Sequence, residues 1–306
     1  STTTKDLYNR FNSKFPNSNW VAYDTDSQEN QILGIKNVAN KNLLPIYHFE
    51  KVDVILSIDS DILGNDINGI HNQKGFSKRR KVKNKSDRMN RLYCVESALT
   101  TTGMMSDHRF KIKPTQVFSF IAELNNSLTS LGISKLKKIN QSKVDFKDEI
   151  SQKFIKALAE DLFKNKSHSL ISVGAELNPS IHSLVYLINE ALLNNNKTIT
   201  YHTVNDAILS DSDSLIKLFN DINSGKIDTL LVLDLDFYHL FSHYFKKEIS
   251  SLVNIVYLGS HNDTTSKNAF WSIPKSHYLE SWGDAVSLDG TYSIVQPLIR
   301  PLYNSM

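Results

Sequence analysis

Two apolar runs in this sequence each end in a pair of aspartates. Asp59 and Asp61 follow VILSI, and Asp234 and Asp236 follow LLVL. If both runs are strands of a parallel sheet, the aspartates lie at the carboxyl ends of the strands, where such sheets usually bind ligands. The four carboxylates are therefore the first candidates for a functional site.

Two interpretations of these aspartates are open. They could bind a metal ion, with His239 and His243 one and two helical turns beyond Asp236. Alternatively, they cap the next helices or line a solvated crevice. Carboxylates two residues apart, without a third clear ligand, are a weak sign of a metal site, so we favour the second interpretation.

A strongly basic segment, GFSKRRKVKNKSDRMNR, has Lys or Arg at eight of its seventeen positions. Dense positive charge can bind the phosphates of lipids or nucleic acids. No aromatic residue follows Phe76 in the segment, so base stacking is not expected. We therefore expect a solvated loop or a docking surface for an acidic partner, and no nucleic-acid partner.

Other common chemistries find little support. Cys94 is the single cysteine, which excludes a thiolate-bound iron–sulfur cluster within this chain. It lies in the apolar run RLYCV and is expected to be a buried strand residue. The sequence contains no G-x-G-x-x-G, P-loop or G-x-S-x-G motif. His277 is the most site-like histidine, although a lone histidine is more often structural.

Apolar runs and helical periodicity alternate along the chain and predict an α/β fold with mainly parallel sheets covered on both faces. Strands are expected at 20–24, 52–58, 91–95, 169–173, 198–202, 227–233 and 252–258. Helices are expected at 4–15, 27–39, 114–129 and 148–163, and around 181–192, 215–222 and 237–244. The polar insert 60–90 is too long for an ordinary loop between a strand and a helix.

The length of 306 residues and the 40% hydrophobic content favour two domains. A polar stretch at 135–147 predicts the boundary, giving domains 1–140 and 141–306. The net charge of +3 is small. No run of about 18 apolar residues occurs, so direct membrane insertion is not expected.

The C-terminal stretch resembles the closing segment of the third domain of molybdopterin oxidoreductases. Asp263–Thr264 matches an acidic-Thr pair of that family, and Ser272–Ile273–Pro274 matches a short strand that ends in Leu-Pro. Glu280 with Gly283 matches the next motif. Asp289–Gly290 matches a further one, except that Thr291 replaces an arginine.

Further upstream, VDVILSIDSDILG and ESALTTTG are similar to one branch of this family, as are SDHR and HYLESWGDA with QPLIRPLY. That branch is the large iron–sulfur subunit of alternative complex III, a membrane-bound quinol:electron acceptor oxidoreductase. The resemblance implies two Rossmann-like domains equivalent to domains II and III of the family. It also implies iron–sulfur clusters outside this fragment and the other subunits of the complex as partners. The full-length protein would lie peripherally on the periplasmic face of the inner membrane.

Departures from the family pattern bear on the cofactor. Active members usually carry Gly-x-Asn where this chain has Ser57–Ile58–Asp59 and Leu233–Asp234–Leu235–Asp236. The family's Pro-Gly-Thr-Asp, whose aspartate reads guanine, appears here as Lys113–Pro114–Thr115–Gln116. We therefore expect no catalytic residue, no cofactor and a structural role. The alternative is a truncated catalytic subunit that holds molybdenum and molybdopterin guanine dinucleotide.

The crevice expected from this comparison has nine candidate residues. They are Asp59, Asp61, Glu96, Asp234, Asp236, Asp263, Thr264, Glu280 and Gly283. The segment 277–303 is expected to form an irregular cover over the strand ends, anchored by a buried Trp282.

Overall fold

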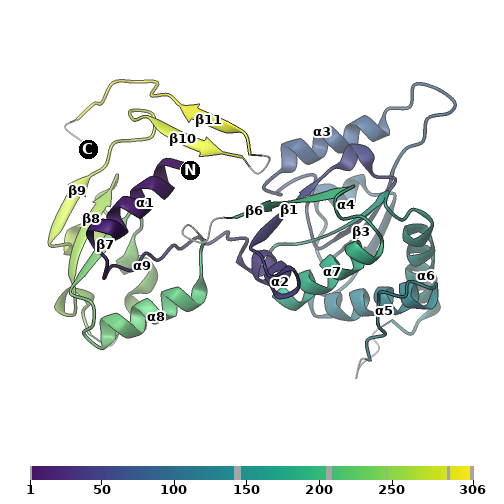
Figure 1. The fold of residues 1–306 in the computed structure, drawn as a ribbon, viewed down its shortest axis with the longest axis horizontal. Helices are drawn as coiled ribbons and strands as arrows, with labels where there is room; N and C mark the ends of the chain where they lie inside the picture. Colours follow the sequence, from purple (N-terminus) through teal and green to yellow (C-terminus); the bar gives the residue numbers. More distant parts are fainter. Residues whose placement is uncertain (1, 141–145, 205–208, 246, 288–289, 304–306) are drawn as a thin grey trace. The chain divides into compact units, whose positions relative to one another are not determined.

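The chain divides into two compact units. The structure, a computed structural model, describes residues 2–140, 146–204, 209–245, 247–287 and 290–303. Unit 1 comprises Ser1–Thr25 and Ala207–Met306, and unit 2 comprises Asp26–Asp206 (Figure 1). Unit 2 is therefore one continuous stretch, which interrupts unit 1 in the sequence.

A four-stranded parallel sheet with the order β4-β3-β2-β5 forms the centre of unit 2. Its strands are β2 (Val54–Ile58), β3 (Arg91–Glu96), β4 (His108–Lys111) and β5 (Ser169–Val173). β2 lies between β3 and β5, and all of its residues are buried. This arrangement confirms the predicted α/β fold with parallel strands.

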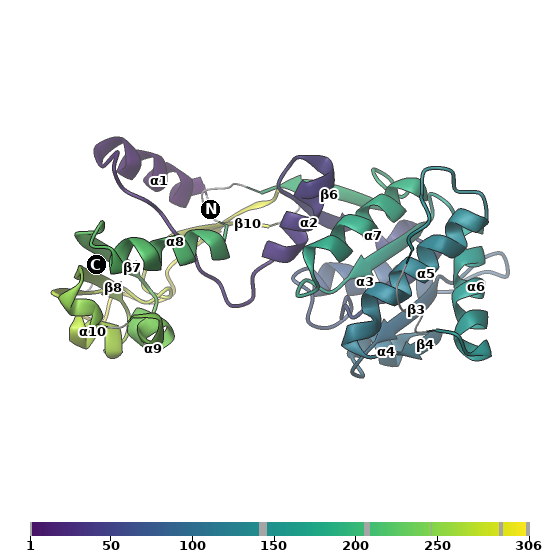
Figure 2. The same ribbon diagram turned by 90° about the horizontal axis from the view of Figure 1, so that it is seen from below.

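Alternate residues of β2 face two different layers of unit 2. Leu56 and Ile58 pack in the cluster formed with α5 (Val117–Ser130), α6 (Glu149–Lys164) and α7 (Pro179–Ala191). Ile55 packs on the opposite face with Phe49 and with Phe76 of α3 (Gly69–Arg80). Figures 1 and 2 show α3 and α6 on opposite sides of the sheet. Both faces of this sheet are therefore covered, as predicted.

The remaining elements of unit 2 lie around this centre. They are α2 (Glu29–Ala39), β1 (Leu43–Tyr47), η1 (Phe49–Lys51), α4 (Thr101–Met105), η2 (Pro114–Gln116) and β6 (Ile199–Thr203). β1 and β6 pair antiparallel, so β6 is not part of the parallel sheet that its apolar run suggested. Gly34 lets α2 approach α7, because a Cβ there would overlap the carbonyl oxygen of Pro179.

Unit 1 contains a smaller parallel sheet with the order β7-β8-β9. Its elements are α1 (Thr2–Lys14), α8 (Ser212–Asn223), β7 (Thr229–Leu233), α9 (Phe237–Phe241), η4 (Ser242–Tyr244), η5 (Ile249–Ser251), β8 (Asn254–Gly259), α10 (Thr264–Asn268), β9 (Trp271–Pro274), β10 (Gly283–Val286) and β11 (Tyr292–Val295). Leu230 and Val232 pack on α8 and α9, whereas Leu231 and Leu233 of the same strand are exposed. The prediction that both faces are covered is therefore wrong for β7.

The predicted domain boundary is also wrong. Strand β5 follows residue 141 in the sequence, but it pairs with β2 in one continuous sheet. Leu136 and Phe146, at the two ends of the polar stretch, are buried in the same core as β2 and β5. The polar stretch therefore connects two parts of unit 2, and the units divide near residues 25 and 206 instead.

Several local predictions need correction. Residues 20–24 form no strand: Ala22 makes an isolated bridge to Ser210, and Trp20 packs against the aromatic rings of α1. The insert 60–90 contains helix α3. The segment 277–303 contains the antiparallel hairpin β10–β11, and Trp282 is 69% exposed, so it is no buried anchor.

Candidate functional site: carboxylates at the strand ends

Asp59 stands immediately after β2 with a left-handed backbone, at φ 46°. This conformation is uncommon for residues other than glycine. The backbone N–H of Asp59 donates to the carbonyl of Val95 at 2.8 Å, and Ser97 donates to the Asp59 carboxylate through its N–H and Oγ, each at 3.0 Å. The Asp59 carboxylate therefore lies across the ends of β2 and β3.

The carbonyl oxygen of Asp59 lies close to the end of β5, on the side of β2 opposite to β3. A Cβ on Gly174, just after β5, would overlap this oxygen. Gly174 in turn donates its N–H to the carbonyl of Ile58 at 3.0 Å. Glycine is needed here because the two strand ends approach each other closely.

Asp61 binds the first turn of α4. Its Oδ1 accepts hydrogen bonds from the N–H of Thr102 at 2.9 Å and from Thr102 Oγ1 at 2.7 Å. Thr102 Oγ1 also accepts from the N–H of Leu63 at 3.0 Å. Burial opposes ionisation of Asp61, but the hydrogen bonds from Thr102 outweigh it and hold the pKa of Asp61 below its usual range.

Unit 1 repeats this arrangement. Asp234 follows β7 with φ 58°, and its N–H donates to the carbonyl of Leu258 at 2.8 Å. Asp236 Oδ1 accepts from the N–H of Thr265 at 3.1 Å and from Thr265 Oγ1 at 2.7 Å. Thr265 Oγ1 accepts from the N–H of Tyr238 at 2.9 Å, as Thr102 does from Leu63. Each unit therefore carries the same D-x-D and threonine device at its strand ends.

The two helices held by this device begin in the same way. Thr100 caps α4 by accepting from the N–H of Gly103 at 3.1 Å, and Asp263 caps α10 by accepting from the N–H of Ser266 at 2.8 Å. Thr264, next to Asp263, donates its N–H to Asp236 at 3.4 Å. Asp263 and Thr264 thus belong to the unit 1 site.

The strand-end sites of the two units differ in two ways: in the partner of the left-handed aspartate (Asp59 or Asp234), and in a buried glutamate that is found in unit 2. Asp234, half-exposed, pairs with Lys275 at 2.5 Å. In unit 2, Glu96 ends β3 with a side chain that is 1% exposed. It accepts from Arg109 Nε at 2.5 Å and from Thr100 Oγ1 at 2.7 Å.

Two glycines reflect this difference between the sites: Gly103 beside the Glu96 side chain, and Gly259 at the position in unit 1 that corresponds to Glu96. Gly103 leaves space for the Glu96 carboxylate, because a Cβ there would overlap Glu96 Oε1. Gly259, which ends β8, takes the place of Glu96 in unit 1. Unit 1 therefore has no counterpart of this buried acid among its described strand-end residues.

Two predicted candidates lie elsewhere in unit 1. Glu280 belongs to the C-terminal segment and accepts from the N–H of Leu302 at 3.3 Å. Gly283 opens β10 opposite Val295 of β11. Among the described residues, neither Glu280 nor Gly283 forms a hydrogen bond with the strand-end aspartates.

The structure bears on the metal and capping interpretations of the aspartates. Over the described residues, no group of three His, Cys, Asp or Glu side chains could hold a metal ion. Asp236 caps α9 by accepting from the N–H of His239 at 3.3 Å, which confirms the capping interpretation for this residue. Cys94 is buried, as predicted, and burial raises its pKa.

Gln116 and His277 have local roles. The side-chain oxygen of Gln116 accepts from the N–H of Lys113 at 3.0 Å and closes the turn before α5. His277 Nδ1 accepts from the N–H of Leu279 at 3.3 Å and is exposed. Both side chains therefore stabilise turns.

Sequence reasoning missed the residues that hold the carboxylates. They are Ser97, Thr102, Arg109, Thr265 and Lys275. The usable signal was the recurrence of Asp-x-Asp at 59–61 and 234–236, followed in each unit by a Thr-Thr pair, at 101–102 and 264–265.

Comparisons with known proteins show the fold. No protein-family model and no curated protein matches this sequence. Among solved structures, the chain is similar to acetylene hydratase from Pelobacter acetylenicus, with a TM-score of 0.57 and 10% identity over 91% of this chain and 48% of that chain. It is also similar to the formyltransferase/hydrolase complex (FhcABCD) from Methylorubrum extorquens in complex with methylofuran, with a TM-score of 0.52 and 9% identity over 93% of this chain and 79% of that chain.

The chain thus spans about half the length of acetylene hydratase. At these identities the likeness shows the fold alone, and it supports the molybdopterin-oxidoreductase-like fold that the sequence resemblance implies. No helix among the described residues is long and apolar enough to cross a membrane.

Proposed function

We propose that this chain is a cofactor-free, structural and docking region of a molybdopterin-oxidoreductase-like subunit in a respiratory electron-transfer complex. The complex we favour is alternative complex III, on the residues that resemble its large iron–sulfur subunit. The clusters would lie elsewhere in the full-length protein, which would be peripheral on the periplasmic face of the inner membrane. Its partners would be the other subunits of this quinol-oxidising complex.

The observation that carries the cofactor-free proposal is the pair of left-handed aspartates. Asp59 and Asp234 stand at the turns after β2 and β7, where glycine is the residue best suited to the backbone. A carboxylate about 4 Å from a phosphate repels it by about 1 kcal/mol in water and by about 4 kcal/mol at an effective dielectric of 20. Asp59 therefore fits a phosphate-bearing dinucleotide poorly, whereas the ion pair with Lys275 offsets part of the charge of Asp234.

The hydrogen bonds of Asp59 add a second argument. Its carboxylate already accepts from the N–H and Oγ of Ser97, the kind of donors that would bind an anionic ligand. The side chain thus serves as an anion that the protein supplies itself. Gln116, at the position that the resemblance assigns to guanine recognition, uses its oxygen within its own turn.

Exposed apolar side chains support the docking part of the proposal. Leu231 and Leu233 of β7 and Trp271 of β9 are exposed, although parallel sheets are usually covered on both faces. Trp282 and Leu298 of the C-terminal segment are also exposed. Surfaces of this kind commonly mark protein–protein interfaces.

A truncated catalytic subunit is the second candidate. Asp61 and Asp236 favour it, because both turn toward threonines of the next helix and leave the space beyond the strand ends clear of their own charge. Only Asp59 and Asp234 would then oppose a dinucleotide. Stoichiometric molybdenum in the intact protein would establish this candidate.

Titration calorimetry tests the proposal with GDP, which carries the guanine and the pyrophosphate of the cofactor. We expect no binding to the wild type and weak binding to the double variant Asp59→Gly with Asp234→Gly. Asn40→Gly is the matched control, because Asn40 is also left-handed, at φ 54°, but has no charge. Micromolar binding to the wild type would overturn the proposal, and no gain in the double variant would show that charge is not the reason.

A further inference from the structure

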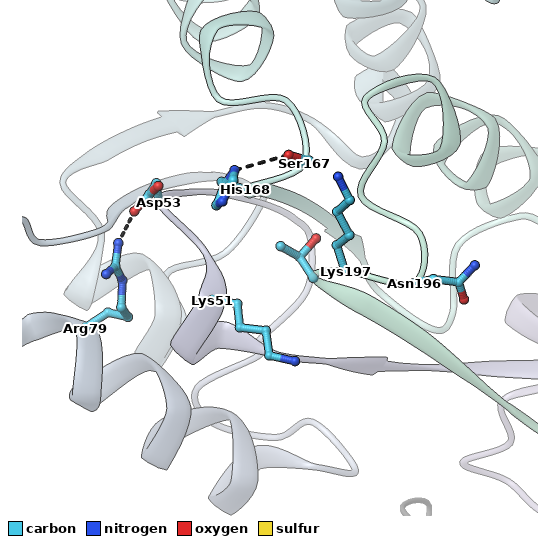
Figure 3. Close-up of a pocket in the computed structure, with 8 residues that line it drawn as sticks. Lys51, Asp53, Arg79, Ser167, His168, Asn196 and Lys197 are labelled. Carbon is cyan, nitrogen blue, oxygen red and sulfur yellow. Dashed lines mark hydrogen bonds and ion pairs between the residues drawn. The ribbon is translucent and has the colours of Figure 1, made fainter.

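A pocket of about 500 Å³ opens in unit 2 at the end of the sheet opposite to the aspartates. Among its lining residues, Asp53 precedes β2 and His168 precedes β5, and Arg79 lies in the last turn of α3. Figure 3 shows them around the opening, with Arg79 turned toward Asp53. Lys51 and Lys197 complete the charged lining.

The charge of this pocket is positive and largely unbalanced. Asp53 is the one carboxylate in its lining, and it forms an ion pair with Arg79. No ion pair of Lys51 or Lys197 is found in the part of the chain that the structure describes. Lys51 and Lys197 therefore line the pocket without an ion-pair partner among the described residues.

A second pocket of about 460 Å³ adjoins the first, because Arg79 lines both. Its other basic residues are Lys78, Lys81, Lys83 and Arg88. Asp87, its one acid, accepts from the N–H groups of Lys83 at 2.8 Å and of Asn84 at 2.9 Å, so its carboxylate shapes the turn.

The arginines next to the pockets are held in place, whereas the lysines are not. Arg80 pairs with Asp107 at 2.6 Å and lies 4.7 Å from the ring centroid of Phe76. Arg91 pairs with Asp161 at 2.6 Å. These pairs fix α3 and the start of β3, so the surplus of charge lies on the pocket lysines and Arg88. The whole chain carries only +3, so this surplus is a local concentration of positive charge.

We propose that the two pockets that share Arg79 form a binding site for a ligand that carries several phosphate charges. Lysine ammonium groups bind phosphate oxygens as point charges, and several lysines line the two pockets. No Phe, Tyr or Trp among the described residues lines either pocket, which disfavours base stacking and single-stranded nucleic acid. The ligand is either a free phosphorylated molecule or the headgroup of an anionic lipid.

The test uses sodium tripolyphosphate as the probe, with sodium sulfate at equal ionic strength as the reference. The variant Lys51→Ala with Lys197→Ala removes the free charges of the first pocket. The matched control is Lys36→Ala with Lys156→Ala, which removes two exposed helix lysines that line neither pocket. Calorimetry gives the affinity, and circular dichroism verifies that all variants are folded.

We expect tripolyphosphate to bind the wild type more tightly than sulfate does, and the pocket variant to lose about tenfold in affinity, equivalent to one charge-assisted contact. The control should bind as the wild type does. Equal binding of both anions, or equal affinity of the pocket variant and the wild type, would overturn the proposal.

Vesicles distinguish the two sources of phosphate once tripolyphosphate has bound. Sedimentation with phosphatidylglycerol vesicles, but not with phosphatidylcholine vesicles, and release by tripolyphosphate would identify a lipid headgroup. Tripolyphosphate binding without sedimentation would identify a free phosphorylated ligand.

Discussion

Replacing Arg109 with Met should destabilise unit 2 strongly. The Glu96 side chain is 1% exposed and that of Arg109 is 30% exposed, with 2.5 Å between Arg109 Nε and Glu96 Oε1. Removing one partner of a buried ion pair costs about 3–5 kcal/mol, because the remaining charge is left uncompensated. Thr100 still donates to Glu96 in the variant, and Arg109 is partly exposed, so we expect about 3 kcal/mol at pH 7.

The loss should depend on pH with a definite sign. In the wild type, burial opposes ionisation of Glu96, but Arg109 and Thr100 outweigh it and hold the pKa of Glu96 below its usual range. This contribution is present above the unfolded pKa of about 4.3 and is lost as the pH falls through the folded pKa. In the variant, burial without the arginine should raise the pKa of Glu96, so the destabilisation should shrink as the pH falls through that raised pKa and should be relieved once the pH reaches the unfolded pKa of about 4.3.

Urea unfolding at pH 7 and at pH 4 measures both effects. All three tryptophans, Trp20, Trp271 and Trp282, belong to unit 1, so their fluorescence follows unit 1 while circular dichroism follows both units. Lys153→Met is the control, because it breaks an exposed ion pair with Glu149 and should cost less than about 0.5 kcal/mol. A loss below about 1 kcal/mol at pH 7, or an equal loss at both pH values, would refute the reasoning.

Three further predictions concern other buried or exposed side chains. Thr102→Val and Thr265→Val should each lower the free energy of unfolding by about 2 kcal/mol, because a buried backbone N–H and an aspartate carboxylate both lose their hydrogen-bond partner. In urea unfolding, circular dichroism should report the loss in the Thr102 variant, and tryptophan fluorescence should report it in the Thr265 variant. Burial lowers the pKa of His182 to about 4, so the unfolded chain binds a proton first as the pH falls. Stability should therefore drop by about 2–3 kcal/mol between pH 6.5 and 4.5, and His182→Leu should flatten this slope in unfolding titrations. Trp282→Ala should leave the melting temperature almost unchanged, because the ring is exposed; a loss above about 1 kcal/mol would show that a contact holds it.

Local patterns predicted the elements that bury an apolar run or stripe. SLISV became β5 and LLVL became the end of β7, and the helix expected at 114–129 begins with η2 at Pro114 and continues as α5. Strand β1 was missed because its LLPIY sequence contains Pro45, which is unfavourable inside a sheet. Helix α3 was missed because basic residues and two glycines hide its single buried stripe.

Pairing between distant segments could not be predicted from one sequence. The polar stretch 135–147 has the composition of a linker, and nothing in it indicates that β5 returns to β2. The D-x-D pairs were found, but their threonine partners lie 41 and 29 residues further on, so the repeated device became visible only in three dimensions.

The interruption of unit 1 by unit 2 has a consequence for synthesis on the ribosome. Helix α1 is made before unit 2, but its contact with β10, through the N–H of Thr3 and Asp284, joins residues 281 positions apart. Unit 2 is continuous and can bury its own core as soon as it emerges, since domains generally fold as units during translation. We therefore expect α1 to remain without its β10 partner until the chain beyond unit 2 has been made, and its apolar side chains are then a target for chaperones.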